Sequence, residues 1–176
     1  MKTKEMIHIA LMAALISVSA PLSIPIGNVP ISLATLTIML SGALFGRKIG
    51  ALSTILYILL GIIGIPVFAG YSSGIGVILG MTGGYVVGYI PLAYLSGLFA
   101  ELGKNKTGIK QLFIQFTGMI LGTLVLYIIG TIYFEYIMQL PLWSALMACV
   151  IPFLPGDLVK MILVVILSKR LKQLKK

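Results

Sequence analysis

The segment Pro152-Phe153-Leu154-Pro155-Gly156-Asp157-Leu158-Val159-Lys160 places two opposite charges in an apolar stretch that otherwise carries none from Leu140 to Ser168. Asp157 is the only aspartate of the chain. A charge near the middle of a transmembrane helix costs roughly 2.5–3.5 kcal/mol, so this pair needs a structural or functional reason. Residues three apart on a helix lie on one face, so the two side chains are expected to lie together.

Two interpretations of the Asp157 and Lys160 pair are open at this point. The first is a buried ion pair that holds helices together. The second is a polar pocket for a small solute, which we favour. Pro155-Gly156 directly before the pair can start a helix or break one, and a break frees backbone donors and acceptors at membrane depth.

The composition indicates an all-α integral membrane protein with a single domain over residues 1–176. Hydrophobic residues make up 59% of the 176 residues and charged residues only 10%, and the mean hydropathy is +1.12. A soluble domain carries about 25% charged residues. The net charge of +9 does not indicate nucleic-acid binding, because the basic residues stand in short clusters between apolar spans.

The residues that usually carry catalysis or bind metals are scarce. Cys149 and His8 are the only cysteine and histidine, which excludes a disulfide framework and a structural zinc site. His8 is far along the chain from Asp157, so no triad of nucleophile, histidine and carboxylate is expected. Gly103-Lys104-Asn105 lacks the other residues of a phosphate-binding loop. The sequence therefore predicts neither an enzyme nor a bound cofactor.

The hydrophobic pattern predicts six transmembrane helices. They cover about residues 6–24, 31–46, 49–64, 76–99 and 111–132, and a last span that ends before Lys169-Arg170. Prolines and glycine between residues 21 and 30 predict a stiff turn. The apolar segment 64–74 is expected to fold back over the outer mouth of the protein. Glycines at 80, 84 and 88 either allow close helix packing or line a pocket.

The basic residues predict the orientation in the membrane. In the six-span layout, every Lys and Arg except Lys160 falls on one side, which is 12 of 13. The positive-inside rule then puts both termini in the cytoplasm. At about 1.5 Å per residue, Lys160 lies roughly 13 Å and Asp157 about 18 Å inward from Lys169. In a hydrocarbon core about 30 Å thick, Asp157 is therefore in the outer half, nearer a pocket filled from outside.

Three segments together resemble a known family. Pro66-Val67-Phe68-Ala69-Gly70, Thr82-Gly83-Gly84-Tyr85, and residues 152–157 with Lys160 resemble, in order and spacing, the motifs of the BioY family. These proteins are the biotin-specific substrate-capture (S) subunits of energy-coupling-factor (ECF) transporters. The resemblance covers essentially the whole chain. It departs from the family pattern at Met81, where proline is usual, and at Ala34, where glutamine is common.

The resemblance implies a non-enzymatic, high-affinity biotin-binding subunit, multi-pass in the plasma membrane of a prokaryote and surrounded by membrane lipid. Its expected partners are a transmembrane coupling protein and two cytoplasmic ATPases, whose ATP use drives inward release. Ala10 and Ala14 resemble the AxxxA motif that docks such subunits on the coupling protein.

The resemblance also implies the binding residues. Asp157 would accept the ureido N–H groups, while Lys160 would donate to the ureido oxygen, donate to the carboxylate, or neutralise Asp157. The other residues expected to contact the ligand are Phe68, Ala69, Gly70, Thr82, Gly83, Gly84 and Tyr85.

Alternatives exist for the ligand and for the mechanism. Because Ala34 would remove a hydrogen-bonding group, a related carboxylated, sulfur-containing vitamin such as lipoate is a second candidate. A proton-coupled secondary transporter with Asp157 as the proton site is a rival mechanism, although the halves show no evident inverted repeat. A membrane scaffold without a solute, in which the ion pair is structural, is a third possibility.

Overall fold

The computed structural model describes residues 2–24 and 30–174. Most of these residues are helical, and the only strands among them are the short β1 and β2. In chain order the elements are α1 (Thr3–Ser19), β1 (Ser23–Ile24), β2 (Ile31–Ser32), α2 (Ala34–Phe45), α3 (Arg47–Ile62), the 3-10 turn η1 (Ala69–Tyr71), α4 (Ile75–Leu79), α5 (Gly83–Leu102), α6 (Ile109–Met138), α7 (Leu142–Cys149), the 3-10 turn η2 (Ile151–Phe153) and α8 (Leu154–Leu174).

The segment between the first two helices differs from the prediction. α1 ends at Ser19, earlier than the predicted end at residue 24, because the chain turns at Ala20 and Pro21. β1 then pairs antiparallel with β2, with Ser23 opposite Ser32. The predicted stiff turn is therefore partly a small hairpin, and its residues 25–29 lie outside the described part of the chain.

The fourth and fifth predicted spans also have different boundaries. The fourth is divided into α4 and α5, and a Cβ added to Gly83 would overlap the backbone of Ile78, so this tight junction requires glycine. The fifth continues to Met138 instead of ending near residue 132. Packing explains the extension, because Phe134 is fully buried and the Tyr133 hydroxyl donates to the Ile78 carbonyl at 3.1 Å.

Within the described residues, three helical stretches are long and apolar enough to cross a membrane. They are Gly83–Leu102, Ile109–Met138 and Leu142–Leu171. α2 has only 12 residues. At about 1.5 Å per residue this length covers about 18 Å, less than a hydrocarbon core of about 30 Å. The fold is thus a helical bundle with strongly apolar helices, and the six-span count stays a prediction.

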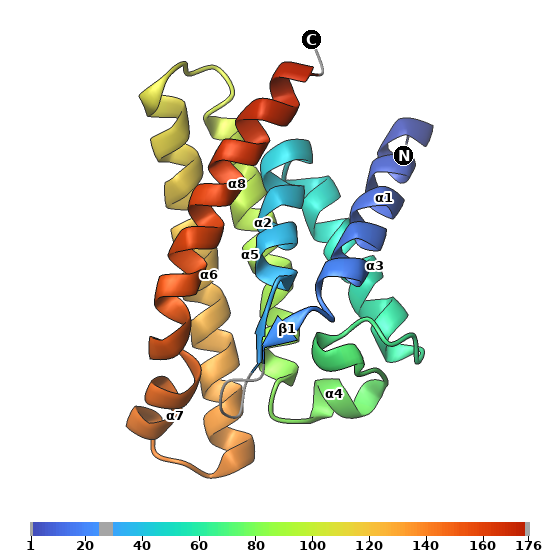
Figure 1. Cartoon of the computed structure of the whole chain (residues 1–176), viewed down its shortest axis with the longest axis vertical. Helices are drawn as coiled ribbons and strands as arrows, with labels where there is room; N and C mark the ends of the chain where they lie inside the picture. Colours follow the sequence, from blue (N-terminus) through green and yellow to red (C-terminus); the bar gives the residue numbers. More distant parts are fainter. Residues whose placement is uncertain (1, 25–29, 175–176) are drawn as a thin grey trace.

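α5 lies at the centre of the bundle and packs against α6, α2 and α3. Figure 1 shows α6 and α8 on one side of the molecule and α1 on the other. The α5–α6 contact depends on small residues, since a Cβ added to Gly88 would lie 3.2 Å from the Leu126 Cα, and one at Gly84 would lie 3.0 Å from the Ile129 carbonyl oxygen. Both predicted roles are therefore found among these glycines: Gly84 and Gly88 lie in the helix contact, whereas Gly80 lines a cavity.

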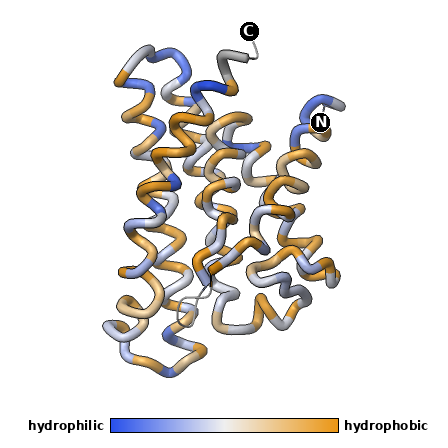
Figure 2. Tube along the Cα trace, in the orientation of Figure 1, coloured by the Kyte–Doolittle hydropathy of each residue, from blue (hydrophilic) through white to orange (hydrophobic). Residues whose placement is uncertain are grey.

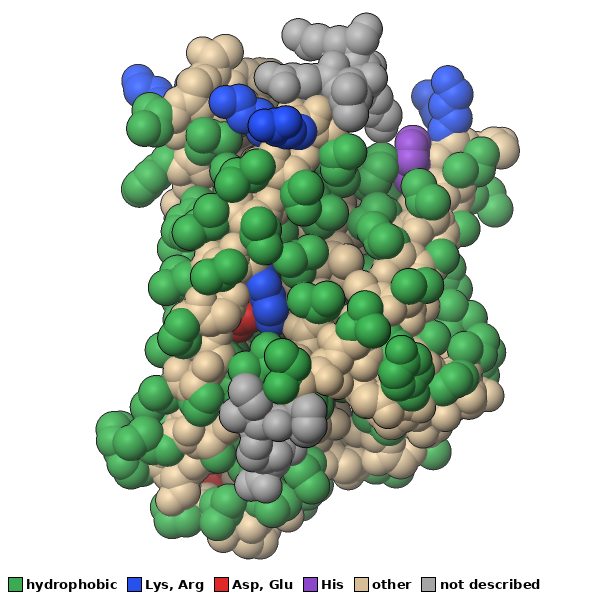
Figure 3. All heavy atoms as spheres, viewed as in Figure 1, with side chains coloured by type: hydrophobic (Ala, Val, Ile, Leu, Met, Phe, Trp, Pro, Cys, Tyr) green, Lys and Arg blue, Asp and Glu red, His purple; other side chains and the backbone are tan. Residues whose placement is uncertain are grey.

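The two ends of the bundle differ in charge. Both termini and the α5–α6 loop lie at one end, and β1, α4 and α7 lie at the other (Figure 1). Hydrophilic residues are concentrated at the end with the termini (Figure 2), where Lys and Arg side chains gather (Figure 3). We call this end, which carries Arg47, Lys48, Lys104, Lys169 and Arg170 among others, the basic end. There the Glu101 carboxylate accepts from the Arg47 backbone N–H at 2.9 Å and pairs with its guanidinium at 3.3 Å.

Candidate ligand-binding site

Asp157 lies in the first turn of α8. The helix begins at Leu154, directly after the 3-10 turn η2, so Pro155-Gly156 starts a helix here. Proline is tolerated in a first helical turn because the backbone N–H there has no helical partner. The positive end of the helix dipole favours the Asp157 carboxylate at this position. Asp157 and Lys160 are only 5% and 7% exposed, which makes them a buried pair of opposite charges.

Lys160 connects three segments of the chain. Its ammonium donates to the Asp157 Oδ1 at 3.0 Å, to the Thr35 Oγ1 at 2.9 Å and to the Ser32 carbonyl oxygen at 2.8 Å. A lysine ammonium has three N–H groups, and all three are used in this arrangement. Lys160 therefore holds α8 against α2 and β2, as the ion-pair interpretation expected.

The Asp157 carboxylate has two further donors. The Tyr127 hydroxyl on α6 donates to Oδ2 at 2.5 Å, and the Thr35 hydroxyl donates to Oδ1 at 3.4 Å. A buried ion pair is tolerated when such hydrogen bonds satisfy its remaining polar groups. Because a carboxylate can accept at about four lone-pair sites, Asp157 keeps acceptor capacity for a ligand.

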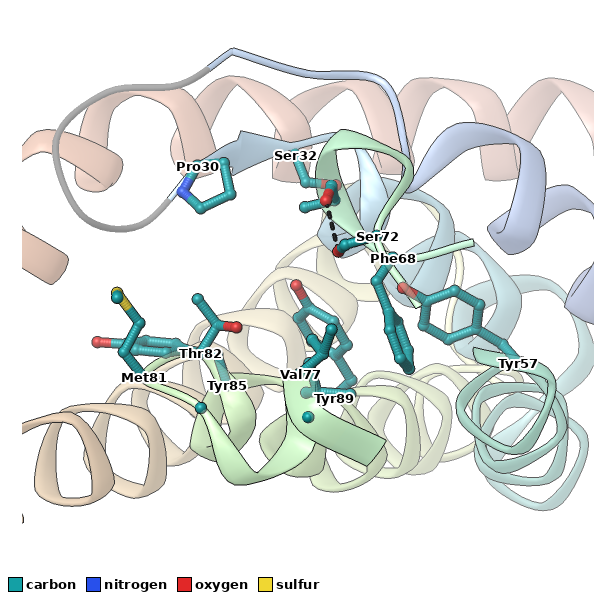
Figure 4. A pocket seen from close by; sticks show the side chains of 14 residues that line it. Pro30, Ser32, Tyr57, Phe68, Ser72, Val77, Met81, Thr82, Tyr85 and Tyr89 are labelled. Atoms are coloured by element: carbon teal, nitrogen blue, oxygen red, sulfur yellow. Dashed lines mark hydrogen bonds between the residues drawn. The ribbon is translucent and has the colours of Figure 1, made fainter. Parts of the chain in front are cut away.

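Two adjoining cavities lie beside this pair. A small cavity of about 40 Å³ is bordered by Asp157, Lys160 and Tyr127. A larger one of about 320 Å³ extends toward α4 and η1. Both cavities have four lining residues in common, which are Pro30, Ser32, Tyr85 and Tyr89. Figure 4 shows Pro30 and Ser32 on one side of the larger cavity and the two tyrosines on the facing side. The polar pair thus lies next to a wider, aromatic space.

Aromatic rings form the walls of the larger cavity. Phe68 is buried and meets the Tyr57 ring edge to face, with centroids 5.7 Å apart. The Tyr85 hydroxyl is fixed by the Thr131 hydroxyl at 3.1 Å. The segment that carries Phe68 folds against the hairpin region, where the Gly70 N–H donates to the Pro21 carbonyl at 3.2 Å. The apolar segment 64–74 therefore lines the larger cavity through Phe68, Ala69 and Ser72, at the end opposite the basic end, and its position at the outer surface stays a prediction.

The cavities contain most of the predicted ligand-contacting residues, but not all of them. Asp157, Lys160, Tyr85, Phe68, Ala69 and Thr82 line one cavity or both. Gly70, Gly83 and Gly84 do not line either cavity. Gly70 is exposed with a positive φ of 66°, and the other two lie in close helix contacts. These three glycines shape the backbone around the site.

The two departures from the family pattern lie in different places. Met81 lines the larger cavity and is exposed. Ala34 is fully buried and lines neither cavity, and its backbone N–H donates to the Ser32 hydroxyl at 2.9 Å. The next residue, Thr35, contacts the charged pair instead.

Several tyrosines that line the cavities have no clear signal in the sequence. Tyr57, Tyr89 and Tyr127 come from three different helices, α3, α5 and α6. Tyr85 and Tyr89 are four residues apart and share a helix face, which is the one indication that the sequence offers. Within the described residues, no group of three His, Cys, Asp or Glu side chains lies close enough to hold a metal ion.

Ala10 and Ala14 line neither cavity and lie on the exposed face of α1. The opposite face of this helix packs into the core through Ile9, Met12, Ala13 and Ile16. The exposed face carries apolar side chains around the two alanines, including Ile7, Leu11, Leu15 and Val18. An apolar face with a small-residue strip is suited to close contact with another helix.

Gly61→Ala should destabilise the protein and weaken ligand binding. A Cβ at Gly61 would overlap the Phe68 ring, which would have to leave its place in the cavity wall. Overpacking of this kind costs typically about 1–3 kcal/mol. Gly156→Ala is the matched control, since nothing lies within 4 Å of a Cβ there. Denaturant unfolding in detergent would compare the two, and equal stabilities would contradict the tight Gly61–Phe68 contact.

These features define a helical membrane protein with an aromatic-lined cavity beside a buried ion pair. Comparison with known protein families matches residues 1–176 to the BioY family. The chain belongs to this family. It is therefore a component of a transporter and not an enzyme.

Individual relatives agree over nearly the full length. The chain is 38% identical to the probable biotin transporter BioY of Pyrococcus horikoshii, over 98% of each chain. It is 33% identical to the biotin transporter BioY of Thermotoga maritima, over 97% of each. A crystal structure of the S-component for biotin from an ECF-type ABC transporter superposes with a TM-score of 0.85 at 31% identity, covering 98% of this chain and 95% of that one.

Proposed function

We propose that this chain captures biotin in the membrane as the S subunit of an ECF-type transporter. The observation that carries the proposal is the Asp157–Lys160 pair buried beside a largely apolar cavity of about 320 Å³. Ligand pockets typically measure about 300–1,000 Å³ and combine apolar walls with a few polar groups. The relatives named as biotin transporters support the same ligand.

The ureido ring of biotin fits the polar end of the site. Its two N–H groups are donors, and Asp157 is a charged acceptor with free capacity beside the small cavity. Hydrogen bonds to an ionised partner contribute about 1.5–3 kcal/mol each, so this contact would supply much of the affinity. The apolar part of the bicycle and the alkyl chain would then lie along Phe68 and Tyr57 in the larger cavity.

Of the three roles considered for Lys160, we infer that it holds and neutralises Asp157. Its three N–H groups already bond Asp157, Thr35 and Ser32, so a ligand group would have to displace one of them. Among the described residues that line the two cavities, Lys160 is the only cation. The biotin carboxylate is therefore expected toward the mouth of the larger cavity, near hydroxyl groups such as Ser72 and Thr82.

Titration calorimetry with biotin and lipoate tests this assignment. Lipoate has a carboxylate and sulfur but no ureido group, so it cannot donate to Asp157. We expect biotin to bind at least about tenfold more tightly, the difference of one charged hydrogen bond. If lipoate binds equally well, Asp157 does not recognise a ureido group, and the lipoate alternative replaces the proposal.

Transport would require further subunits. We infer a transmembrane coupling protein that receives the Ala10 and Ala14 face, and two cytoplasmic ATPases that supply energy. Uptake of biotin should then survive collapse of the proton gradient and fail without ATP. The reverse result would favour the proton-coupled alternative, in which Asp157 is the proton site.

The proposed orientation has six spans, both termini in the cytoplasm of a prokaryotic cell, and the cavity nearer the outer surface. Gln139→Cys should react with an impermeant maleimide on intact cells, while Asn105→Cys should not, because the two exposed positions lie at opposite ends of the bundle. The native Cys149 is buried and gives little background. If only the Asn105→Cys variant is labelled, the orientation in the membrane is the reverse of the one proposed.

A further inference from the structure

A groove runs between α6 and α8 at the basic end, apart from the ligand cavities and from α1. It consists of two adjoining hollows of about 260 Å³ and 440 Å³. Leu112, Val165 and Ile166 line both hollows, so they form one continuous surface feature. Neither the proposed biotin site nor the Ala10 and Ala14 face uses any of these residues.

The groove changes character along its length. Its first part is apolar and includes side chains that are highly exposed, with Ile109 at 82% and Phe113 at 73%. The other part ends at the exposed cations Lys169 and Arg170. Among the described residues that line the two hollows, none is acidic. The groove thus offers an apolar channel that leads to two adjacent positive charges.

A buried polar contact fixes α6 and α8 near the charged part of the groove. The Gln115 side chain donates to the Ser168 hydroxyl at 2.9 Å, and both residues are almost completely buried. Ser168 directly precedes Lys169, so this hydrogen bond also helps to fix the positions of Lys169 and Arg170 relative to α6. Such a contact is strong away from water, because neither group has solvent as an alternative partner.

We propose that this groove binds an anionic phospholipid, with an acyl chain along the apolar part and the phosphate between Lys169 and Arg170. The apolar and charged parts follow the order of a lipid that lies along a membrane protein with its headgroup at the interface. A guanidinium matches the geometry of a phosphate, and basic pockets between transmembrane helices favour acidic headgroups.

The test uses the purified full-length chain and measures lipid retention by native mass spectrometry. Phosphatidylglycerol should be retained more than phosphatidylcholine with the same acyl chains. Each basic residue near an anionic lipid strengthens binding on the order of fivefold, so the preference should be roughly tenfold or more. Lys169→Gln with Arg170→Gln should remove this preference while biotin binding stays unchanged. The control Lys104→Gln with Lys106→Gln removes two charges from the same end, outside the groove. This control should keep the preference for phosphatidylglycerol.

A second variant distinguishes a lipid seated in the groove from lipid attracted by surface charge alone. Ile166→Trp fills the groove without changing charge, because Ile166 is exposed and lines both hollows. It should reduce retention of phosphatidylglycerol. Unchanged retention in this variant, or equal losses in both charge variants, would overturn the proposal in favour of general surface attraction. If Ile166→Trp instead prevents transporter assembly with normal lipid retention, the groove belongs to a protein partner.

Discussion

Asp157→Asn should lower the affinity for biotin by about tenfold to a few hundredfold, the equivalent of one charged hydrogen bond. The substitution keeps the shape of the side chain but replaces one acceptor oxygen with a donor. That donor would face the ureido N–H groups or the Tyr127 hydroxyl, which now donates at 2.5 Å. Titration calorimetry with biotin gives the affinity of the parent and the variant directly.

Variants of Lys160 separate binding from stability. Lys160→Met removes the cation and leaves Asp157 as a buried charge, and breaking a buried pair in this way costs about 3–5 kcal/mol of stability. The double variant with Asp157→Asn is neutral, so it should fold at least as well as either single variant and still bind biotin poorly. Thermal unfolding of the empty proteins provides the control. If the double variant binds biotin like the parent, the pair is structural only and the ligand binds elsewhere.

Ala10→Leu combined with Ala14→Leu should prevent assembly with the coupling protein and abolish biotin uptake. Both alanines are exposed on α1, and two leucines there would keep a partner helix from approaching closely. Biotin binding by the isolated chain should persist, since neither residue lines a cavity. Copurification of the complex and titration of the isolated subunit measure the two effects separately.

A leucine placed elsewhere on the exposed surface controls for added bulk. Ser144→Leu on α7 is suitable, because this exposed position lies far from α1 (Figure 1). It should leave both assembly and binding intact. If assembly and binding fail together in the alanine variants, α1 contributes to the internal packing of the subunit and the docking assignment is wrong.

The helices and the buried ion pair at the centre of the candidate site could be predicted from the sequence because both depend on local patterns. Long apolar stretches separated by prolines, glycines and charges indicate where the helices lie, and an isolated Asp157 and Lys160 in such a stretch indicate a buried polar site. The spacing places Asp157 and Lys160 on one helix face, and they form an ion pair in which the Lys160 Nζ lies 3.0 Å from the Asp157 Oδ1. Each of these inferences needs only residues close together in the chain.

The remaining features depend on contacts between distant segments. The Tyr127 hydroxyl reaches Asp157 across 30 positions of the chain, and the Ser32 carbonyl reaches Lys160 across 128. Hydropathy does not distinguish a tyrosine that faces a cavity from one that faces lipid. A motif also does not show how a residue takes part in a site: Gly83 and Gly84 lie in close helix contacts and line neither cavity, so their contact with the ligand stays a prediction.

Two of the hydrogen bonds of Ser32 lead in opposite directions. Its carbonyl oxygen accepts from Lys160, while its hydroxyl donates to the carbonyl of Ala20 at 2.7 Å, at the end of α1. A ligand that draws Lys160 away from Ser32 would therefore also disturb the attachment of the helix that carries Ala10 and Ala14. Thermodynamic reciprocity then applies, so a partner seated on α1 would change the affinity for the vitamin by the same factor as the vitamin changes the affinity for the partner. One coupling free energy would then link the affinity for the vitamin to the affinity for the partner.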